Sequence, residues 1–155
     1  MRIGLGCDTH RLTEGRRLVL GGIEIEHTKG LLGHSDADAL IHAVIDAVLG
    51  AAGLGDIGTL FPDTDMKYKD ISSVVLLQEA GRRVREAGYE IVNIDTVIIA
   101  EKPKMAPYKA LMAAKMAEAL EIDPSQINVK AKTNEKMGFT GNEEGIETRA
   151  VALLN

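Results

Sequence analysis

Hydrophobic and polar positions recur along most of the chain with the spacing of strands or helices, and together they predict an α/β fold. Apolar and polar residues alternate over 16–27, on both sides of Gly21 and Gly22, which predicts a β-hairpin with a two-residue turn. The other predicted strands are 2–8, 89–101, 127–133 and 146–155. The predicted helices are 36–53, 71–88 and 107–122, the last with Pro107 in its first turn and Met112, Met116 and Leu120 as an apolar seam.

The order of these elements predicts a single domain over residues 1–155, classed as α/β (α+β), with a mixed four-stranded sheet, the separate hairpin and helices packed on one face. The strand at 89–101 is nearly continuously apolar at its end, so we expect it to be buried on both faces. The other sheet face, which no helix covers, is expected to meet a partner subunit. Polar, glycine-containing segments at 29–36, 53–65 and 134–145 are expected to be loops.

Ser35 is the expected N-cap of the first helix, with Asp38 as its capping-box partner. Asp38, His42 and Asp46 then share one stripe of that helix, because they are four residues apart. Free N–H groups at a helix start also favour an anion such as phosphate, here beside His34 and Ser35. Capping and anion binding are compatible at this position.

Composition excludes several function classes. The 155 residues carry a formal net charge of −5, so no overall positive field would attract nucleic acid. The only cysteine, Cys7, cannot form an internal disulfide and fits a reducing cytoplasm. On its strand Cys7 points away from Asp8 and is expected to be a small buried side chain. No segment has the length of a membrane span, so we expect a cytoplasmic protein without nucleic-acid or membrane partners.

Asp8, His10 and His42 form the most suggestive group of polar residues. Asp8 and His10 point the same way if the first strand continues to residue 10. Two imidazoles and a carboxylate suit a zinc ion with an open position, or a facial triad on a larger ion. The pattern alone leaves a simpler alternative, in which Asp8 is a cap, His10 lies on the surface and His42 bonds to Asp38 or Asp46.

Cationic and hydroxyl side chains follow two of the predicted strands, where α/β sheets tend to bind ligands. They could meet phosphate groups, although lysines in loops are usually solvated. These side chains are Lys102, Lys104, Lys132, Thr133 and Lys136. Glu135 could be a second metal ligand or an exposed acid.

Six sequence blocks occur in order over essentially the whole chain. They are G-x-G-x-D-x-H at 4–10, GHSDAD followed after three residues by HAVIDAVLGAAGLGDIG at 33–58, FPDTD at 61–65, EKPKM at 101–105, KTNEKMGFTG at 132–141 and EGI at 144–146. The chain thereby resembles the 2-C-methyl-D-erythritol 2,4-cyclodiphosphate synthases. The resemblance implies a lyase of non-mevalonate isoprenoid synthesis that converts 4-diphosphocytidyl-2-C-methyl-D-erythritol 2-phosphate to the 2,4-cyclodiphosphate plus CMP.

The resemblance also implies residue roles. Asp8, His10 and His42 are expected to hold zinc or manganese, and Glu135 to face a magnesium or manganese ion that bridges the diphosphate. His34 and Thr133 are the expected catalytic residues, which orient and polarise the reacting phosphate. Beyond these six, the expected contacts with the cytidine diphosphate substrate are Ser35, Asp56, Ile57, Gly58, Phe61, Pro62, Asp63, Thr64, Asp65, Ala100, Glu101, Lys102, Pro103, Lys104, Met105, Ala106, Lys132, Asn134, Phe139 and Asn142. The expected assembly is a homotrimer with active sites shared between subunits.

Three positions differ from the common pattern of this family. Asn142 stands where many members carry arginine, and Arg149 stands where an acid is common, so the resemblance does not extend to isoprenoid-diphosphate binding in a central trimer cavity. Lys132 stands where threonine is common and could add a phosphate contact. Two other function classes would use the same residues: a metal-dependent phosphohydrolase and a cytidine-nucleotide-binding module without turnover.

Overall fold

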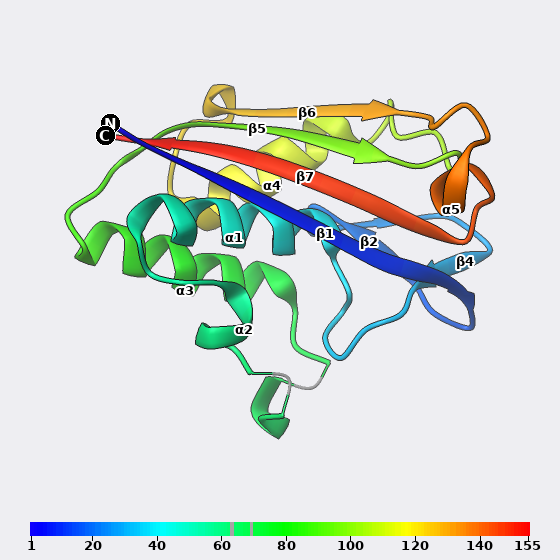
Figure 1. Ribbon diagram of the computed structural model, residues 1–155, viewed down its shortest axis with the longest axis horizontal. Coiled ribbons are helices and arrows are strands. Elements are labelled where there is room, and N and C mark those ends of the chain that lie inside the picture. The colour runs from blue at the N-terminus through cyan, green and yellow to red at the C-terminus, as the bar shows by residue number, and fades with distance from the viewer. Residues whose placement is uncertain (63, 69) are drawn as a thin grey trace.

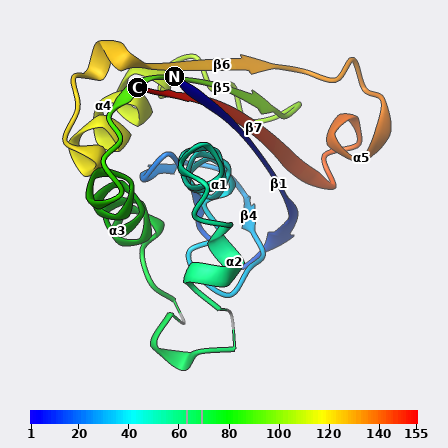
Figure 2. The ribbon, with the colours of Figure 1, turned by 60° about the vertical axis from the view of Figure 1, so that its left-hand side comes forward.

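A long helix, α1 (Ala39–Ala52), lies inside the curve of a mixed sheet, and two further helices lie beside it (Figures 1 and 2). The computed structural model describes residues 1–62, 64–68 and 70–155. The sheet has the order β4-β1-β7-β5-β6; β5 and β6 run parallel and the other neighbours antiparallel. Its strands are β1 (Arg2–Glu14), β4 (Lys29–Leu31), β5 (Ile91–Ile99), β6 (Ile127–Lys132) and β7 (Gly145–Leu154). The predicted α/β class and mixed sheet are confirmed.

The sheet has one strand more than the four predicted. Strand β1 continues to Glu14 instead of ending at residue 8, and its last three residues pair with Lys29–Leu31, a segment expected to be a loop. Three residues are too few to show an alternating pattern, so this pairing leaves no signal in the sequence. The greater length of β1 places Asp8 and His10 on the same strand.

Two glycines on β1 allow α1 to pack directly against the sheet. A Cβ atom at Gly4 would lie 2.0 Å from the carbonyl oxygen of Ala47, and one at Gly6 would lie 1.9 Å from that of Ala43. Both distances are far inside van der Waals contact, so only glycine permits this approach. The packing brings the strand that carries Asp8 close to the helix that carries His42.

The predicted hairpin is confirmed as β2 (Leu18–Leu20) paired with β3 (Ile23–Ile25). Gly21 and Gly22 form its turn at φ values of 60° and 73°, in the left-handed region that glycine adopts without strain. Their N–H groups donate to the carboxylate of Asp38 at 2.9 and 2.6 Å, which fixes the turn to the start of α1.

Asp38, and not Ser35, is the N-cap of α1. Its carboxylate accepts a hydrogen bond from the Ile41 N–H at 3.0 Å, and the helix begins at Ala39. The Ser35 hydroxyl instead accepts from the Ala37 N–H at 3.2 Å, within the loop before the helix. The predicted cap was wrong because both residue types are good caps, and the contacts of Asp38 with the hairpin turn decide between them.

Helix α3 (Ser73–Glu86) packs against α1, and α4 (Lys109–Leu120) packs against α3 and β6, with the predicted seam of Met112, Met116 and Leu120 fully buried. Pro107 precedes α4 rather than lying in its first turn. The segments expected to be loops contain the short helices α2 (Ile57–Leu60) and α5 (Gly138–Gly141), and two 3-10 turns occur at Met66–Tyr68 and Pro124–Gln126. No helix in the described residues is long and apolar enough to cross a membrane.

The sheet face away from α1 is uncovered. Ile3 and Leu5 on β1 are 74% and 65% exposed, and Cys7 is exposed as well, so its expected burial is wrong. Buried and partly exposed residues alternate along β5 from Ile94 to Ile98, so the expected burial on both faces is also wrong. Both errors have one cause: no part of the described chain covers the apolar residues of this face.

Candidate active site

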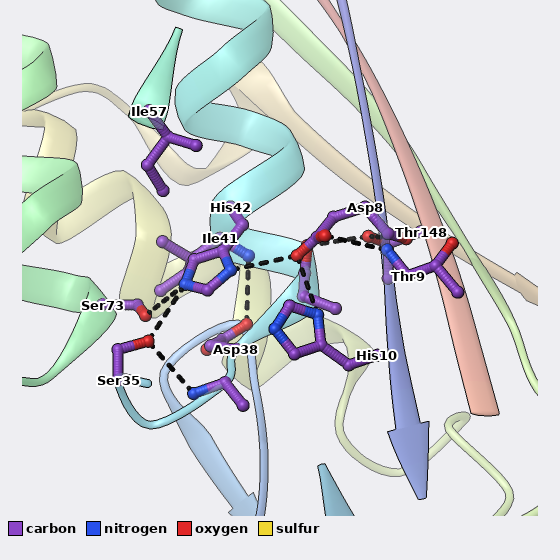
Figure 3. Close-up of polar contacts among 12 residues, drawn as sticks. Asp8, Thr9, His10, Ser35, Asp38, Ile41, His42, Ile57, Ser73 and Thr148 are labelled. Carbon is purple, nitrogen blue, oxygen red and sulfur yellow. Dashed lines mark hydrogen bonds and ion pairs between the residues drawn. The ribbon is translucent and has the colours of Figure 1, made fainter. Parts of the chain in front are cut away.

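Asp8, His10 and His42 converge where β1 passes the first turns of α1 (Figure 3). The Asp8 Oδ2 atom lies 3.0 Å from His42 Nδ1 and 3.1 Å from His10 Nδ1. One potential ligand atom from each residue lies within 4.8 Å of the others, and no second group of this kind occurs in the part of the chain that the structure describes. The structure therefore brings together the three residues predicted to form the metal site.

These side chains fit a divalent metal ion. His10 Nδ1 is buried and has no hydrogen-bond partner among the described residues, although Asp8 is close. An ion between the three side chains would give this nitrogen a partner. Two imidazole nitrogens and one carboxylate are also a common donor set for divalent ions that keep a position open for a ligand.

The simpler alternative, in which His42 bonds to Asp38 or Asp46, is wrong. The Asp38 carboxylate caps α1 and holds the hairpin turn. The Asp46 carboxylate accepts from the Ile57 N–H at 2.8 Å and so fixes the start of α2. His42 Nδ1 faces Asp8 instead.

Charge couples Asp8 to the two histidines. Burial alone would raise the pKa of Asp8, but the close approach and charge of His10 and His42 outweigh it and hold this pKa well below its usual range. Burial alone would lower the pKa of His42, but Asp8 outweighs it and the pKa of His42 is raised. Without metal, the site therefore favours a carboxylate beside a protonated imidazole.

The second ring nitrogen of His42 faces two hydroxyl groups. Its Nε2 atom lies 3.0 Å from the Oγ of Ser73 and 3.3 Å from the Oγ of Ser35 (Figure 3). Ser73 is the first residue of α3 and is fully buried. The sequence interpretation included Ser35 and missed Ser73, which resembles any serine at a helix start.

The Asp8, His10 and His42 group borders a cavity of 270 Å³, which several predicted substrate contacts also line. Its lining residues are His10, His34, Ser35, His42, Ile57, Gly58, Phe61, Tyr68 and Leu76. His34 Nε2 is buried and has no hydrogen-bond partner within the described chain. Asp56 caps α2 by accepting from the Thr59 N–H at 2.8 Å.

The predicted contacts that follow Phe61 are not among the lining residues of this cavity. Pro62 and Thr64 are exposed, and Asp65 is half-buried. Asp63 lies outside the described residues.

A second cavity, of 250 Å³, joins the two predicted phosphate-binding segments. Its lining residues are Ala100, Glu101, Pro103, Lys104, Met105, Ala106, Lys109, Ala131, Lys132 and Thr133. Lys102 does not line it, and its ammonium group pairs with Glu143 at 3.1 Å. Phe139 and Asn142, at α5, are exposed and do not line it either.

Glu101 organises the loop that follows β6. One of its carboxylate oxygens accepts from the N–H groups of Asn134 and Lys136 at 2.9 and 3.0 Å. Between them lies Glu135, at a φ of 53°, and its carboxylate accepts from the Thr133 hydroxyl at 3.2 Å. Glu101 was predicted as a substrate contact; in the structure it also shapes the loop that carries Thr133 and Glu135.

The two cavities share no lining residue. His10 lies opposite Ile146 on β7, and Lys132 lies opposite Ile99, which is itself opposite Glu147. The two residues are thus at nearly the same level of the sheet, but β7 and β5 separate their strands, which is about 14 Å at ordinary strand spacing. The two cavities therefore lie apart on the same chain.

Comparison with known proteins identifies the family. A model of the YgbB family matches residues 1–155. The 2-C-methyl-D-erythritol 2,4-cyclodiphosphate synthase of Ralstonia pickettii (strain 12J) is 61% identical over 154 residues, which cover 99% of this chain and 92% of that protein. The chain belongs to the 2-C-methyl-D-erythritol 2,4-cyclodiphosphate synthase family. The resemblance drawn from the six sequence blocks is confirmed.

Solved structures share the fold. A 2C-methyl-D-erythritol-2,4-cyclodiphosphate synthase in its CDP-bound form aligns with a TM-score of 0.91 and 40% identity, covering 99% of this chain and 100% of that one. The bifunctional IspDF of Campylobacter jejuni aligns with a TM-score of 0.95 and 48% identity, covering 99% of this chain and 42% of that one.

The cyclodiphosphate synthase motifs did not point to every residue of the two cavities. Tyr68 and Leu76 complete the first cavity, and Lys109 and Ala131 complete the second. Leu76 is three residues after Ser73, so both lie on one face of α3, but this spacing becomes informative only once the structure places Ser73 beside His42. Tyr68 gave no comparable signal, because it follows a polar segment without periodicity.

Proposed function

We propose that this chain converts 4-diphosphocytidyl-2-C-methyl-D-erythritol 2-phosphate to 2-C-methyl-D-erythritol 2,4-cyclodiphosphate and CMP, a step of non-mevalonate isoprenoid synthesis. The observation that carries the proposal is the Asp8, His10 and His42 group, which opens into a cavity beside His34. Relatives that are 61% and 60% identical bear the name of the synthase that makes this product.

The reaction depends on charge compensation and positioning more than on proton removal. The attacking group is the 2-phosphate, whose second pKa is about 6, so it is mostly dianionic at neutral pH. One of its oxygens forms a bond to the β-phosphorus of the diphosphate. The bond from that phosphorus to the oxygen of CMP breaks, and CMP leaves with the electron pair. No general base is required.

Asp8, His10 and His42 would hold a divalent ion, zinc or manganese, through one carboxylate oxygen and two ring nitrogens. When bound, such an ion supplies positive charge that lowers the repulsion between phosphate groups. Glu135 would hold magnesium or manganese together with the diphosphate, since magnesium is commonly bound by one carboxylate and substrate phosphates.

His34 and Thr133 would orient the reacting phosphate groups. His34 Nε2 is buried without a partner among the described residues, and a phosphate oxygen in the first cavity would give it one. Thr133 lines the second cavity, where its hydroxyl donates to Glu135. Fixing both ends of the substrate supplies the proximity that ring closure needs.

The two cavities suggest how the substrate lies. The first would take the methylerythritol end and the ribose, with Ser35, the 56–58 segment and the 61–65 segment as contacts. The second would take the cytosine and nucleotide phosphates, with the 100–106 segment and the 132–135 segment as contacts. Phe139 and Asn142 remain proposed contacts beside it.

A homotrimer with shared active sites would join the two cavities. In this arrangement the first cavity of one subunit faces the second cavity of its neighbour. The exposed apolar face of the sheet, with Ile3 and Leu5, supports association, and the family resemblance gives the number of subunits. We also propose a cytoplasmic location, where the exposed Cys7 would stay reduced.

Turnover in water enriched in oxygen-18 tests the proposed reaction. A cyclising enzyme produces CMP and cyclodiphosphate that mass spectrometry shows to be free of the label. A phosphohydrolase that uses the same metal ligands would incorporate oxygen-18 into a product phosphate, and a nucleotide-binding module would leave the substrate unchanged. Either of these two outcomes would overturn the proposed function.

A further inference from the structure

Ser73 links the metal-binding group to a carboxylate outside it. Its hydroxyl donates a hydrogen bond to Asp36 Oδ1, and its backbone N–H donates to Asp36 Oδ2 at 2.8 Å. The same hydroxyl oxygen lies 3.0 Å from His42 Nε2 (Figure 3). Asp36, Ser73 and His42 therefore form a continuous chain of hydrogen bonds that ends at a predicted metal ligand.

The direction of this chain follows from the number of protons. A serine hydroxyl has one hydrogen, which Ser73 donates to Asp36, so a lone pair of its oxygen faces His42. An unprotonated Nε2 would set two lone pairs against each other at 3.0 Å, so this geometry favours a proton on Nε2 that is donated to Ser73, with the Ser35 oxygen at 3.3 Å as a second neighbour. A neutral imidazole with a proton at Nε2 has its lone pair at Nδ1, the atom that lies 3.0 Å from Asp8.

We propose that Ser73 and Asp36 are positioning residues for metal binding: they keep the proton of His42 at Nε2 and direct Nδ1 toward the divalent ion. This inference rests on the proposed metal site. Histidines that bind metals usually donate their other N–H to a carboxylate, carbonyl or water, and here a buried serine stands between the imidazole and the carboxylate. Loss of such a partner typically weakens metal binding about 10- to 100-fold.

The Ser73 hydroxyl can be removed without cutting the link between the loop and α3. In Ser73→Ala the backbone N–H of residue 73 still donates to Asp36, so the start of the helix keeps its anchor. The substitution removes the two contacts of the hydroxyl group, with His42 Nε2 and with Asp36 Oδ1. Ser72→Ala is the matched control, because Ser72 is the exposed N-cap of the same helix and its side chain makes no capping hydrogen bond.

The test measures zinc affinity of the full chain by competition with a chromophoric chelator. We expect Ser73→Ala to bind zinc about 10- to 100-fold more weakly than the unchanged chain, and Ser72→Ala to stay within about twofold. Asp36→Asn keeps an acceptor for Ser73 but removes the charge that strengthens it, so we expect a smaller loss. This second variant tests the inference if Ser73→Ala fails to fold.

Nuclear magnetic resonance provides a readout that a purely structural role would not change. In the zinc-loaded chain, uniformly labelled with nitrogen-15, the Nε2 proton of His42 should be visible and protected from solvent exchange. It should lose this protection in Ser73→Ala and keep it in Ser72→Ala. Unchanged affinity and an unchanged protected proton in Ser73→Ala would overturn the inference but leave the metal site intact. If the unchanged chain bound no zinc, the proposed metal site itself would be wrong.

Discussion

The two cavities differ in how their functional side chains are held. The side chains of Asp8, His10 and His42 are only 23%, 15% and 14% exposed, and they stand on a strand and a helix that two glycines bring into direct contact. Lys132 and Thr133, in the second cavity, are exposed. In the proposed site, the first cavity with Asp8, His10 and His42 (the metal half) is therefore held by a strand and a helix of one chain, whereas the second cavity (the nucleotide half) depends on the exposed loop after β6.

His42→Ala should have the largest effect on activity, because it removes a proposed metal ligand from the metal half of the site. We expect loss of the metal and a fall in turnover of about 10³-fold or more, since a bound ion contributes several kcal/mol of charge stabilisation. Metal analysis and the CMP assay measure both losses, and the proposed trimer should persist. His27→Ala is the control, because His27 is the one histidine of the chain that does not line the first cavity. Full zinc content and full turnover in His42→Ala would show that the ligand assignment is wrong.

Leu5→Glu tests whether the two halves must come from different subunits. The substitution places a carboxylate on the exposed sheet face, and burying an unpaired charge costs several kcal/mol. Association should weaken by about 10²-fold or more, and activity should fall with it while each chain still binds its metal. Light scattering gives the mass of the assembly. Leu111→Glu, which alters an exposed leucine of α4, should change neither mass nor activity. A fully active Leu5→Glu monomer would contradict the shared site.

The sequence predicted the three proposed metal ligands better than it predicted the residues around them, and the reasons are physical. Alternation along a strand places Asp8 and His10 on one side whatever the surroundings, and the motif blocks supply His42. The positions of Ser73 and Asp36 relative to His42 depend on how α3 packs against the loop before α1, which no local pattern encodes. Cys7 was misjudged for a similar reason, because the layer that would cover it is not within the described chain.

Glu101→Ala should disturb the nucleotide half alone. Two backbone N–H groups lose a charged acceptor, each such hydrogen bond contributing about 1.5–3 kcal/mol, so the loop with Thr133 and Glu135 should lose its fixed shape. We expect the KM for the substrate to rise about tenfold with zinc affinity unchanged. Glu101→Gln keeps an acceptor oxygen and should restore most of the loss. Equal defects in both variants would instead indicate that the Glu101 charge contacts the substrate.

The smallest expected effect is a pH dependence of the stability of the metal-free chain, which comes from Asp8 and His42. The pKa of His42 is raised, so its contribution to stability is complete below the unfolded value of about 6.5 and is lost as pH rises through the folded value. The pKa of Asp8 is lowered, so its contribution is present above about 3.9 and is lost as pH falls through the folded value. The stabilising window therefore lies between about pH 4 and 6.5, and each unit of pKa shift corresponds to about 1.4 kcal/mol.

Zinc binding should have the opposite pH dependence: the stability of the metal-free chain falls as pH rises through the pKa of His42, whereas zinc affinity rises. His42 must release its Nδ1 proton to bind the ion, so zinc affinity should fall up to about tenfold for each pH unit below its raised pKa, and activity should decline below about pH 6. Thermal unfolding of the metal-free chain and chelator competition between pH 5 and 8 measure the two opposite slopes. His42→Ala should flatten the stability slope above pH 6.5, because it removes the group that titrates there. A flat profile in the unchanged chain, with or without zinc, would mean that Asp8 and His42 do not form the charged pair in solution.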